Sequence, residues 1–183
     1  LIVARAKWWH FLTPLPVILP AFAYAVLSSP YRVERLKAFF HPESGSIARY
    51  HAEQALIAVS TGGIFGKGLG RGVSKHGHLP EDTTDFIFGV ISEELGLVGS
   101  LLVIALFVMI TVAAIRIIMR CRDRFARNLA VAVSLTIIVQ AAINIGVVTV
   151  VLPTKGIPLP FVSAGGTSLL LSAAGAGLLL NIA

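Results

Sequence analysis

An aspartate stands directly before a long apolar segment of this chain. Asp85 ends the polar stretch 79–85 (LPEDTTD) and is followed at once by Phe-Ile-Phe. Partial desolvation at such a boundary favours the protonated form of a carboxyl group, which suits Asp85 to accept a proton as a general base. Aspartate is also a common N-cap at a helix start, and the residues alone favour that structural role for Asp85. Thr83 or Thr84 is an alternative cap.

Basic side chains are concentrated in the segment 29–84, before Asp85. Its seven basic residues are Arg32, Arg35, Lys37, Arg49, Lys67, Arg71 and Lys75. Its five acidic residues are Glu34, Glu43, Glu53, Glu81 and Asp82. Lys and Arg pair well with phosphate oxygens. The segment is therefore either a solvated loop that touches lipid headgroups or a cradle for an anionic substrate.

A second group of candidate residues lies in the segment 152–168 (LPTKGIPLPFVSAGGTS). Lys155 is flanked by prolines, which exclude regular helix there. Ser163, Gly165 and Gly166 follow at the start of the last apolar segment. The pattern fits a tight turn followed by close helix packing. It also fits a cation and a helix N-terminus directed at a phosphate or an oxyanion.

Four further polar residues interrupt the apolar segments. Glu93 and Glu94 follow Asp85, and acids in such positions either pair with polar neighbours or line a polar path. Gln140 and Asn144 are spaced i, i+4, which predicts amide hydrogen bonds between helices.

The sequence predicts neither a metal site nor a disulfide. His76 and His78 flank Gly77, but no third ligand accompanies them. Cys121 is the only cysteine, so no internal disulfide can form.

The elements that must position these residues are membrane helices. Only 13% of the 183 residues are charged, against about 25% in a soluble domain. Acids, Lys and Arg are absent from residues 8–31, 95–115, 128–154 and 156–183. Each run reaches the roughly 20 residues that a bilayer-spanning helix needs. These runs exclude an ordinary water-soluble enzyme, a disordered tail and a disulfide-stapled secreted module.

We therefore predict an all-α, polytopic membrane helix bundle with about four transmembrane helices. The expected spans are residues 8–28, 85–115, 128–151 and 161–183. The segment 29–84 is expected to be a long outer loop, with a short helix over residues 51–60 and a glycine-rich turn over residues 61–70.

The distribution of arginine predicts the orientation in the membrane. Residues 116–127 hold five Arg against one acid, Asp123, and a short loop with such an excess faces the cytoplasm. Arg5 and Lys7 precede the first span and face the same side, so residues 29–84 and 152–160 face outward. The chain begins Leu-Ile-Val rather than with Met, and we expect it to be the C-terminal part of a longer protein.

Three segments together resemble the SEDS family, the FtsW/RodA/SpoVE group of bacterial peptidoglycan glycosyltransferases. They are residues 62–70 (GGIFGKGLG), 79–96 (LPEDTTDFIFGVISEELG) and 153–168 (PTKGIPLPFVSAGGTS). The motif Thr154-Lys155-Gly156 is more similar to the division branch (FtsW) than to the elongation branch (RodA). Thr83 stands where the family usually has His, and Ala164 stands where it usually has Tyr. The family has ten spans, of which this chain matches about the last four.

The resemblance implies a function and reverses the preference for Asp85 as a cap. Such enzymes polymerise lipid II, a disaccharide-pentapeptide on undecaprenyl diphosphate, at the outer face of the bacterial cytoplasmic membrane. Asp85 would be the general base, and Lys75, Arg71 and Lys155 would stabilise the leaving diphosphate. Glu81 and Thr84 would orient Asp85 or bind the acceptor, and Ser163, Gly165 and Gly166 would bind substrate.

The resemblance also bears on cofactors and partners. It identifies no cofactor with certainty, and a divalent cation, Mg²⁺ or Mn²⁺, is the candidate because such ions bridge phosphate oxygens. The implied partners are a class B penicillin-binding transpeptidase and other membrane proteins of the division machinery, with no role for nucleic acid. Two other functions stay open. One is a flippase for a lipid-linked precursor, with Glu93 and Glu94 lining its path, and the other is a non-catalytic division scaffold.

Overall fold

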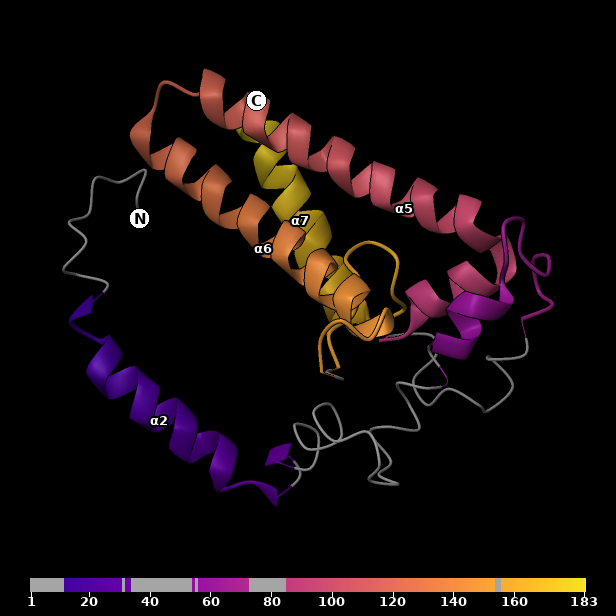
Figure 1. Cartoon of the computed structure of the whole chain (residues 1–183). Coiled ribbons are helices and arrows are strands. Elements are labelled where there is room, and N and C mark those ends of the chain that lie inside the picture. Colours follow the sequence, from indigo (N-terminus) through magenta and orange to yellow (C-terminus); the bar gives the residue numbers. More distant parts are fainter. Residues whose placement is uncertain (1–11, 31, 34–53, 55, 73–84, 154–155) are drawn as a thin grey trace. The chain divides into compact units, whose positions relative to one another are not determined.

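The computed structural model describes residues 12–30, 32–33, 54, 56–72, 85–153 and 156–183. The four helices assigned there are α2 (Leu15–Leu27), α5 (Ile87–Arg120), α6 (Arg124–Val148) and α7 (Gly166–Ile182) (Figure 1). The described part contains no strand, so the predicted all-α class is confirmed. The chain divides into two compact units, residues 1–49 and 50–183.

Helix α2 is the assigned helix of the first unit. Pro14 occupies its N-cap and Pro16 its first turn, where a missing N–H removes no helical hydrogen bond. The helix continues through Pro20 to Leu27. The Arg32 guanidinium donates to the carbonyl oxygen of Ala25 at 2.7 Å.

In the second unit, α6 packs against both α5 and α7. Small residues bring helices close together: a β-carbon at Gly175 of α7 would lie 3.0 Å from Val133 of α6. Helices α5 and α6 are both long and apolar enough to cross a membrane, whereas α2 and α7 are shorter apolar helices. Large apolar side chains cover the outside of α5, including Leu101, Leu102 and Val108.

The helix ends differ from the expected spans in two informative places. Helix α6 ends at Val148, and Val150 has a positive φ of 60°. Helix α7 begins at Gly166 rather than near residue 161, because Phe161 has a φ of 64°, outside the right-handed helical region. Residues 149–165 therefore form an irregular connection, of which residues 154–155 lie outside the described part.

The turn between α5 and α6 is closed by a side-chain cap. Asp123 is the N-cap of α6, and its Oδ2 accepts from the backbone N–H of Ala126 at 2.7 Å.

We expect Asp123→Ala to destabilise the protein by about 1 kcal/mol, because the backbone N–H of Ala126 in the first turn loses its acceptor. The midpoint of thermal unfolding in detergent measures this loss. Asp123→Asn keeps an acceptor and should stay close to the parent, so equal midpoints for the Ala and Asn variants would contradict the prediction.

Candidate functional site

Helix α5 is broken at Gly96. The φ of 66° and ψ of −158° at this residue belong to a region that essentially only glycine occupies. In an unbroken helix the N–H groups of Leu97 and Val98 would donate to the carbonyls of Glu93 and Glu94. The break leaves these four groups in need of other partners, because buried backbone groups are almost always hydrogen-bonded.

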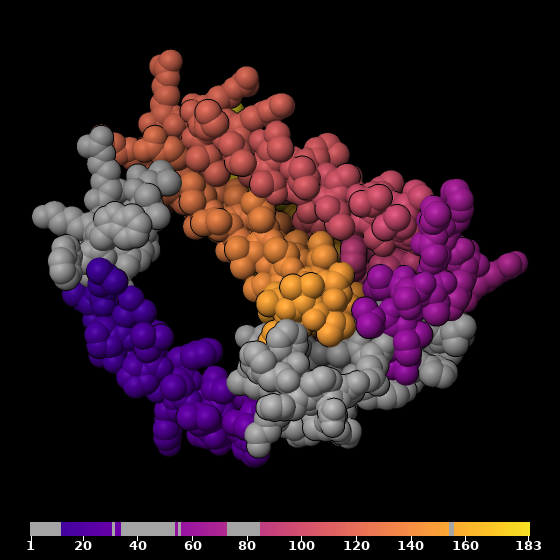
Figure 2. Space-filling view, in the orientation of Figure 1, coloured from indigo at the N-terminus to yellow at the C-terminus, as the bar shows by residue number. Residues whose placement is uncertain are grey.

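The glycine-rich loop, defined here as residues 62–72, supplies all four partners. The bonds are Leu97 N to Gly63 O (2.9 Å), Val98 N to Ile64 O (3.3 Å), Lys67 N to Glu93 O (3.0 Å) and Gly68 N to Glu94 O (3.0 Å). Gly66, with a φ of 76°, makes this approach possible, since a β-carbon there would collide with the Glu94 carbonyl. In Figure 2 the loop covers the beginning of α5. The expected glycine-rich turn is thus an integral part of a helix break.

The two glutamates of α5 lie beneath this loop. Lys67 Nζ forms an ion pair with Glu93 Oε1 at 2.7 Å, and Glu93 is 1% exposed. Glu94 is also buried, and a side chain at Gly72 would come within 3.1 Å of its Oε1. Both acids therefore face the glycine-rich loop. Glu93 pairs with Lys67 from this loop, which agrees with the alternative in which such acids pair with polar neighbours.

Asp85 lies just ahead of α5, whose N-cap is Phe86. The alternative in which Asp85 itself is the N-cap is therefore wrong. Phe86 is buried in a core that includes Val147 and Val148 of α6 and Leu159 of the connection to α7. Asp85 is half-buried beside this core. The part of α5 before Gly96 thus runs in a different direction from the rest of the helix, and its first residues lie near the end of α6 (Figure 1).

Asn144 of α6 connects Asp85 to the proline-rich connection. Its Nδ2 donates to the backbone carbonyl oxygen of Asp85 at 2.8 Å and to that of Ile157 at 2.6 Å. One turn earlier on α6, Gln140 Nε2 donates to the carbonyl oxygen of Pro158 at 2.9 Å. The prolines prevent regular hydrogen bonding in this segment, and the two amides supply donors for its carbonyls.

The carboxylate of Asp85 lies against the same connection. A β-carbon at Gly156 would be 2.6 Å from Asp85 Oδ2, so the carboxylate lies directly against this glycine. Sequence reasoning assigned Gln140 and Asn144 to bonds between helices. For Gln140 the structure bears this out, because its Nε2 lies 3.4 Å from Ser168 Oγ of α7. Both amides also hold the connection that borders Asp85. Their i, i+4 spacing near the end of the span that precedes a proline-rich segment was the available signal.

Three of the other predicted site residues belong to the turn after this loop. Ser163 is buried, and its Oγ accepts from the Leu159 N–H at 2.6 Å, closing the turn. Gly165 is the N-cap of α7, and Gly166 is its exposed first residue. The hydrogen bond between Leu159 and Ser163 is therefore a structural one.

The predicted cations and acids around Asp85 are less completely described. Arg71 is exposed at the end of the glycine-rich loop. Lys75, Glu81, Thr84 and Lys155 lie outside the described residues. Within the described ranges, no group of three or more His, Cys, Asp or Glu residues could hold a metal ion.

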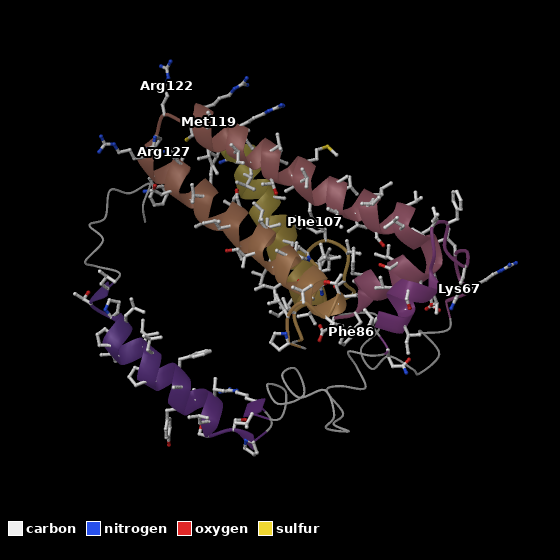
Figure 3. All side chains as sticks on the ribbon, viewed as in Figure 1. Lys67, Phe86, Phe107, Met119, Arg122 and Arg127 are labelled. Atoms are coloured by element: carbon white, nitrogen blue, oxygen red, sulfur yellow. The ribbon has the colours of Figure 1, made fainter. Side chains whose placement is uncertain are left out.

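The site and the arginine-rich turn lie at opposite ends of the bundle. Lys67 and Phe86 mark one end, and Met119, Arg122 and Arg127 mark the other (Figure 3). If the arginine-rich turn faces the cytoplasm, the half-buried carboxylate of Asp85 faces the opposite side. The arrangement can accept a proton from a ligand that approaches this end.

Comparison with known proteins gives one matching family model and several similar relatives. The family model FTSW_RODA_SPOVE, described as "Cell cycle protein", matches residues 1–183. The chain is 44% identical over 167 residues to the "Probable peptidoglycan glycosyltransferase FtsW" of Trichlorobacter lovleyi, covering 91% of this chain and 44% of that protein. It is 41% identical over 181 residues to "Stage V sporulation protein E" of Bacillus subtilis, covering 98% of this chain and 50% of that protein.

A solved structure gives a similar result. It is described as "Structural coordination of polymerization and crosslinking by a peptidoglycan synthase complex". One of its chains aligns with a TM-score of 0.67 and 27% identity, covering 94% of this chain and 48% of that chain. The chain spans about half the length of the curated relatives it matches.

Proposed function

Because the chain belongs to the FtsW/RodA/SpoVE family, we propose that the whole protein of which it forms part polymerises lipid II into glycan strands. The family and the two long apolar helices make it a membrane protein. We further propose that it is multi-pass, lies in the bacterial cytoplasmic membrane and acts at the outer face in cell division. Its relatives named FtsW support the division role.

The observation that carries the proposal is the placement of Asp85. Its carboxylate borders the glycine of the proline-rich connection, at the end of the bundle opposite the arginine-rich turn. From Gly96 to Arg120, α5 is about 37 Å long, enough by itself to cross a hydrocarbon core of about 30 Å. The break at Gly96 would then lie near the outer membrane boundary, and Asp85, Glu93 and Glu94 would stand at or above it.

In the proposed reaction Asp85 is the general base. It takes the proton from the acceptor sugar hydroxyl as that oxygen attacks the anomeric carbon of the donor. The bond between the anomeric carbon and the diphosphate oxygen breaks, and undecaprenyl diphosphate leaves with the electron pair. A single displacement inverts the anomeric configuration, from an α-linked donor to a β-linked glycan.

The leaving diphosphate needs positive charge as it forms. We propose Lys75, Arg71 and Lys155 for this role, with a divalent cation, Mg²⁺ or Mn²⁺, as a candidate bridge between phosphate oxygens. Glu81 and Thr84 would orient Asp85 or bind the acceptor. Ser163, Gly165 and Gly166 would shape the substrate site from the start of α7.

The proposed partner is a class B penicillin-binding transpeptidase, together with other division proteins of the membrane. The support is the similar chain in a peptidoglycan synthase complex that couples polymerisation with crosslinking. A partner that crosslinks the emerging strand must act on the same side of the membrane as the polymerase.

The test is polymerisation by the full-length protein that contains this chain, purified with its transpeptidase partner. We expect labelled lipid II to be converted into long glycan strands that lysozyme digests. Transport of labelled lipid II across vesicles without polymer would instead support a flippase. Partner binding without polymer or transport would support a scaffold, and either result would overturn the glycosyltransferase.

A further inference from the structure

We propose that Asn144 is a positioning residue for Asp85, a role that rests on the proposed function because Asp85 is its general base. Asn144 is 1% exposed and reaches two separate parts of the site with one amide group. It holds the backbone of Asp85 at 2.8 Å and that of Ile157 at 2.6 Å. A single buried side chain thus joins the start of α5 to the proline-rich connection.

The orientation of the Asn144 amide follows from its partners. Both are backbone carbonyl oxygens, which only accept hydrogen bonds, so the amide nitrogen must face them and uses its two N–H groups, one for each. The Asn144 Oδ1 is buried without a hydrogen-bond partner among the described residues. Aspartate at this position would set a carboxylate against the two carbonyls, so the position needs hydrogen-bond donors.

The two backbone carbonyls that Asn144 binds belong to residues next to the Asp85 carboxylate. One belongs to Asp85 itself, and the other belongs to Ile157, which follows the glycine that contacts Asp85 Oδ2. Asn144 therefore holds in place both the backbone from which the Asp85 side chain extends and the segment that its carboxylate contacts. A displacement of about 1 Å in a reacting group can lower a rate by about 100-fold.

Gln140 provides a matched control on the same helix face. Its Nε2 donates to the Pro158 carbonyl oxygen at 2.9 Å and lies 3.4 Å from Ser168 Oγ. It therefore tethers the same connection one turn away, and both of its bonds go to residues other than Asp85. Gln140→Leu removes a tether of the loop, whereas Asn144→Leu removes the tether of the loop and of Asp85 together.

The experiment compares these two variants in the full-length protein with its partner, by steady-state polymerisation of lipid II and by thermal unfolding. We expect Asn144→Leu to lower kcat by at least 10-fold with KM within about twofold, and Gln140→Leu to keep kcat within about threefold. Both variants should lower the unfolding midpoint by similar amounts. Asn144→Ser, which keeps one donor, should give an intermediate kcat.

A double-mutant cycle shows whether Asn144 acts through Asp85. In the Asp85→Asn background, Asn144→Leu should cause little further loss of kcat, because the group that it positions is already inactive. Equal losses of kcat in Asn144→Leu and Gln140→Leu would overturn the proposal. So would a full 10-fold further loss in the Asp85→Asn background. Failure of the proposed function is a separate result, seen as undiminished activity of Asp85→Asn alone.

Discussion

Asp85→Asn in the full-length protein is expected to lower glycan polymerisation from purified lipid II by 10²–10⁴-fold, the range for loss of a general base. The amide has nearly the shape of the carboxylate, so it should keep the approach to Gly156 while losing the ability to take a proton. Asp85→Ala should fall in the same range. The unfolding midpoint of Asp85→Asn should stay near that of the parent, because the amide keeps the shape of the carboxylate.

The matched control for this change is Asp123→Asn. It is the same acid-to-amide replacement at the arginine-rich end of the bundle, where the amide oxygen can still cap α6. We expect its polymerisation rate to match that of the parent. Activity close to the parent in both Asp85→Asn and Asp85→Ala would remove Asp85 from the role of base.

Gly96→Ala is expected to cause the largest loss of stability. Its φ and ψ lie in a region that non-glycine residues occupy at a cost of about 1–3 kcal/mol. A β-carbon at this position would also collide with Gly66 N and Ile64 O, which adds an overpacking cost of about 1–3 kcal/mol. The glycine-rich loop must then detach, and the four backbone groups at the helix break lose their partners.

Two measurements detect the loss of stability in Gly96→Ala. The amount of folded protein extracted from membranes should fall, and the rate of proteolysis within residues 62–72 should rise. Gly63→Ala is the control, because Gly63 has a φ of 56° in the same loop but open space around its β-position. It carries only the left-handed strain of about 1–2 kcal/mol. If Gly96→Ala and Gly63→Ala behaved alike in both measurements, the docked loop would not contribute to stability.

Much of the architecture follows from local properties of the sequence. The long charge-free runs predicted α5 and α6 because a membrane selects apolar residues at every position of a spanning helix. The glycine-rich turn was predicted from its composition, since glycine alone adopts its positive φ angles without strain. The family was predicted from three motifs, and the comparisons confirm it. The role of Asp85 as a base stays a prediction that rests on this family.

Other features depend on contacts between distant segments. The charge-free run did not reveal the break at Gly96, because a single glycine inside a helical pattern is ordinarily tolerated. Only the docking of the glycine-rich loop makes the break favourable. A contact between distant segments also decided the environment of Glu93, because its partner Lys67 lies 26 residues away in the chain.

The sequence by itself determined the helical class, the two long apolar helices and the residue types near the site, because these depend on composition and short-range periodicity. The tertiary structure alone decided that Asn144 would join Asp85 to Ile157, across separations of 59 and 13 residues. Hydrogen bonds of this kind depend on where irregular backbone leaves carbonyls without donors, and packing determines those places. The i, i+4 spacing of the two amides indicated polar contacts, but it did not identify Asp85 and Ile157 as the partners.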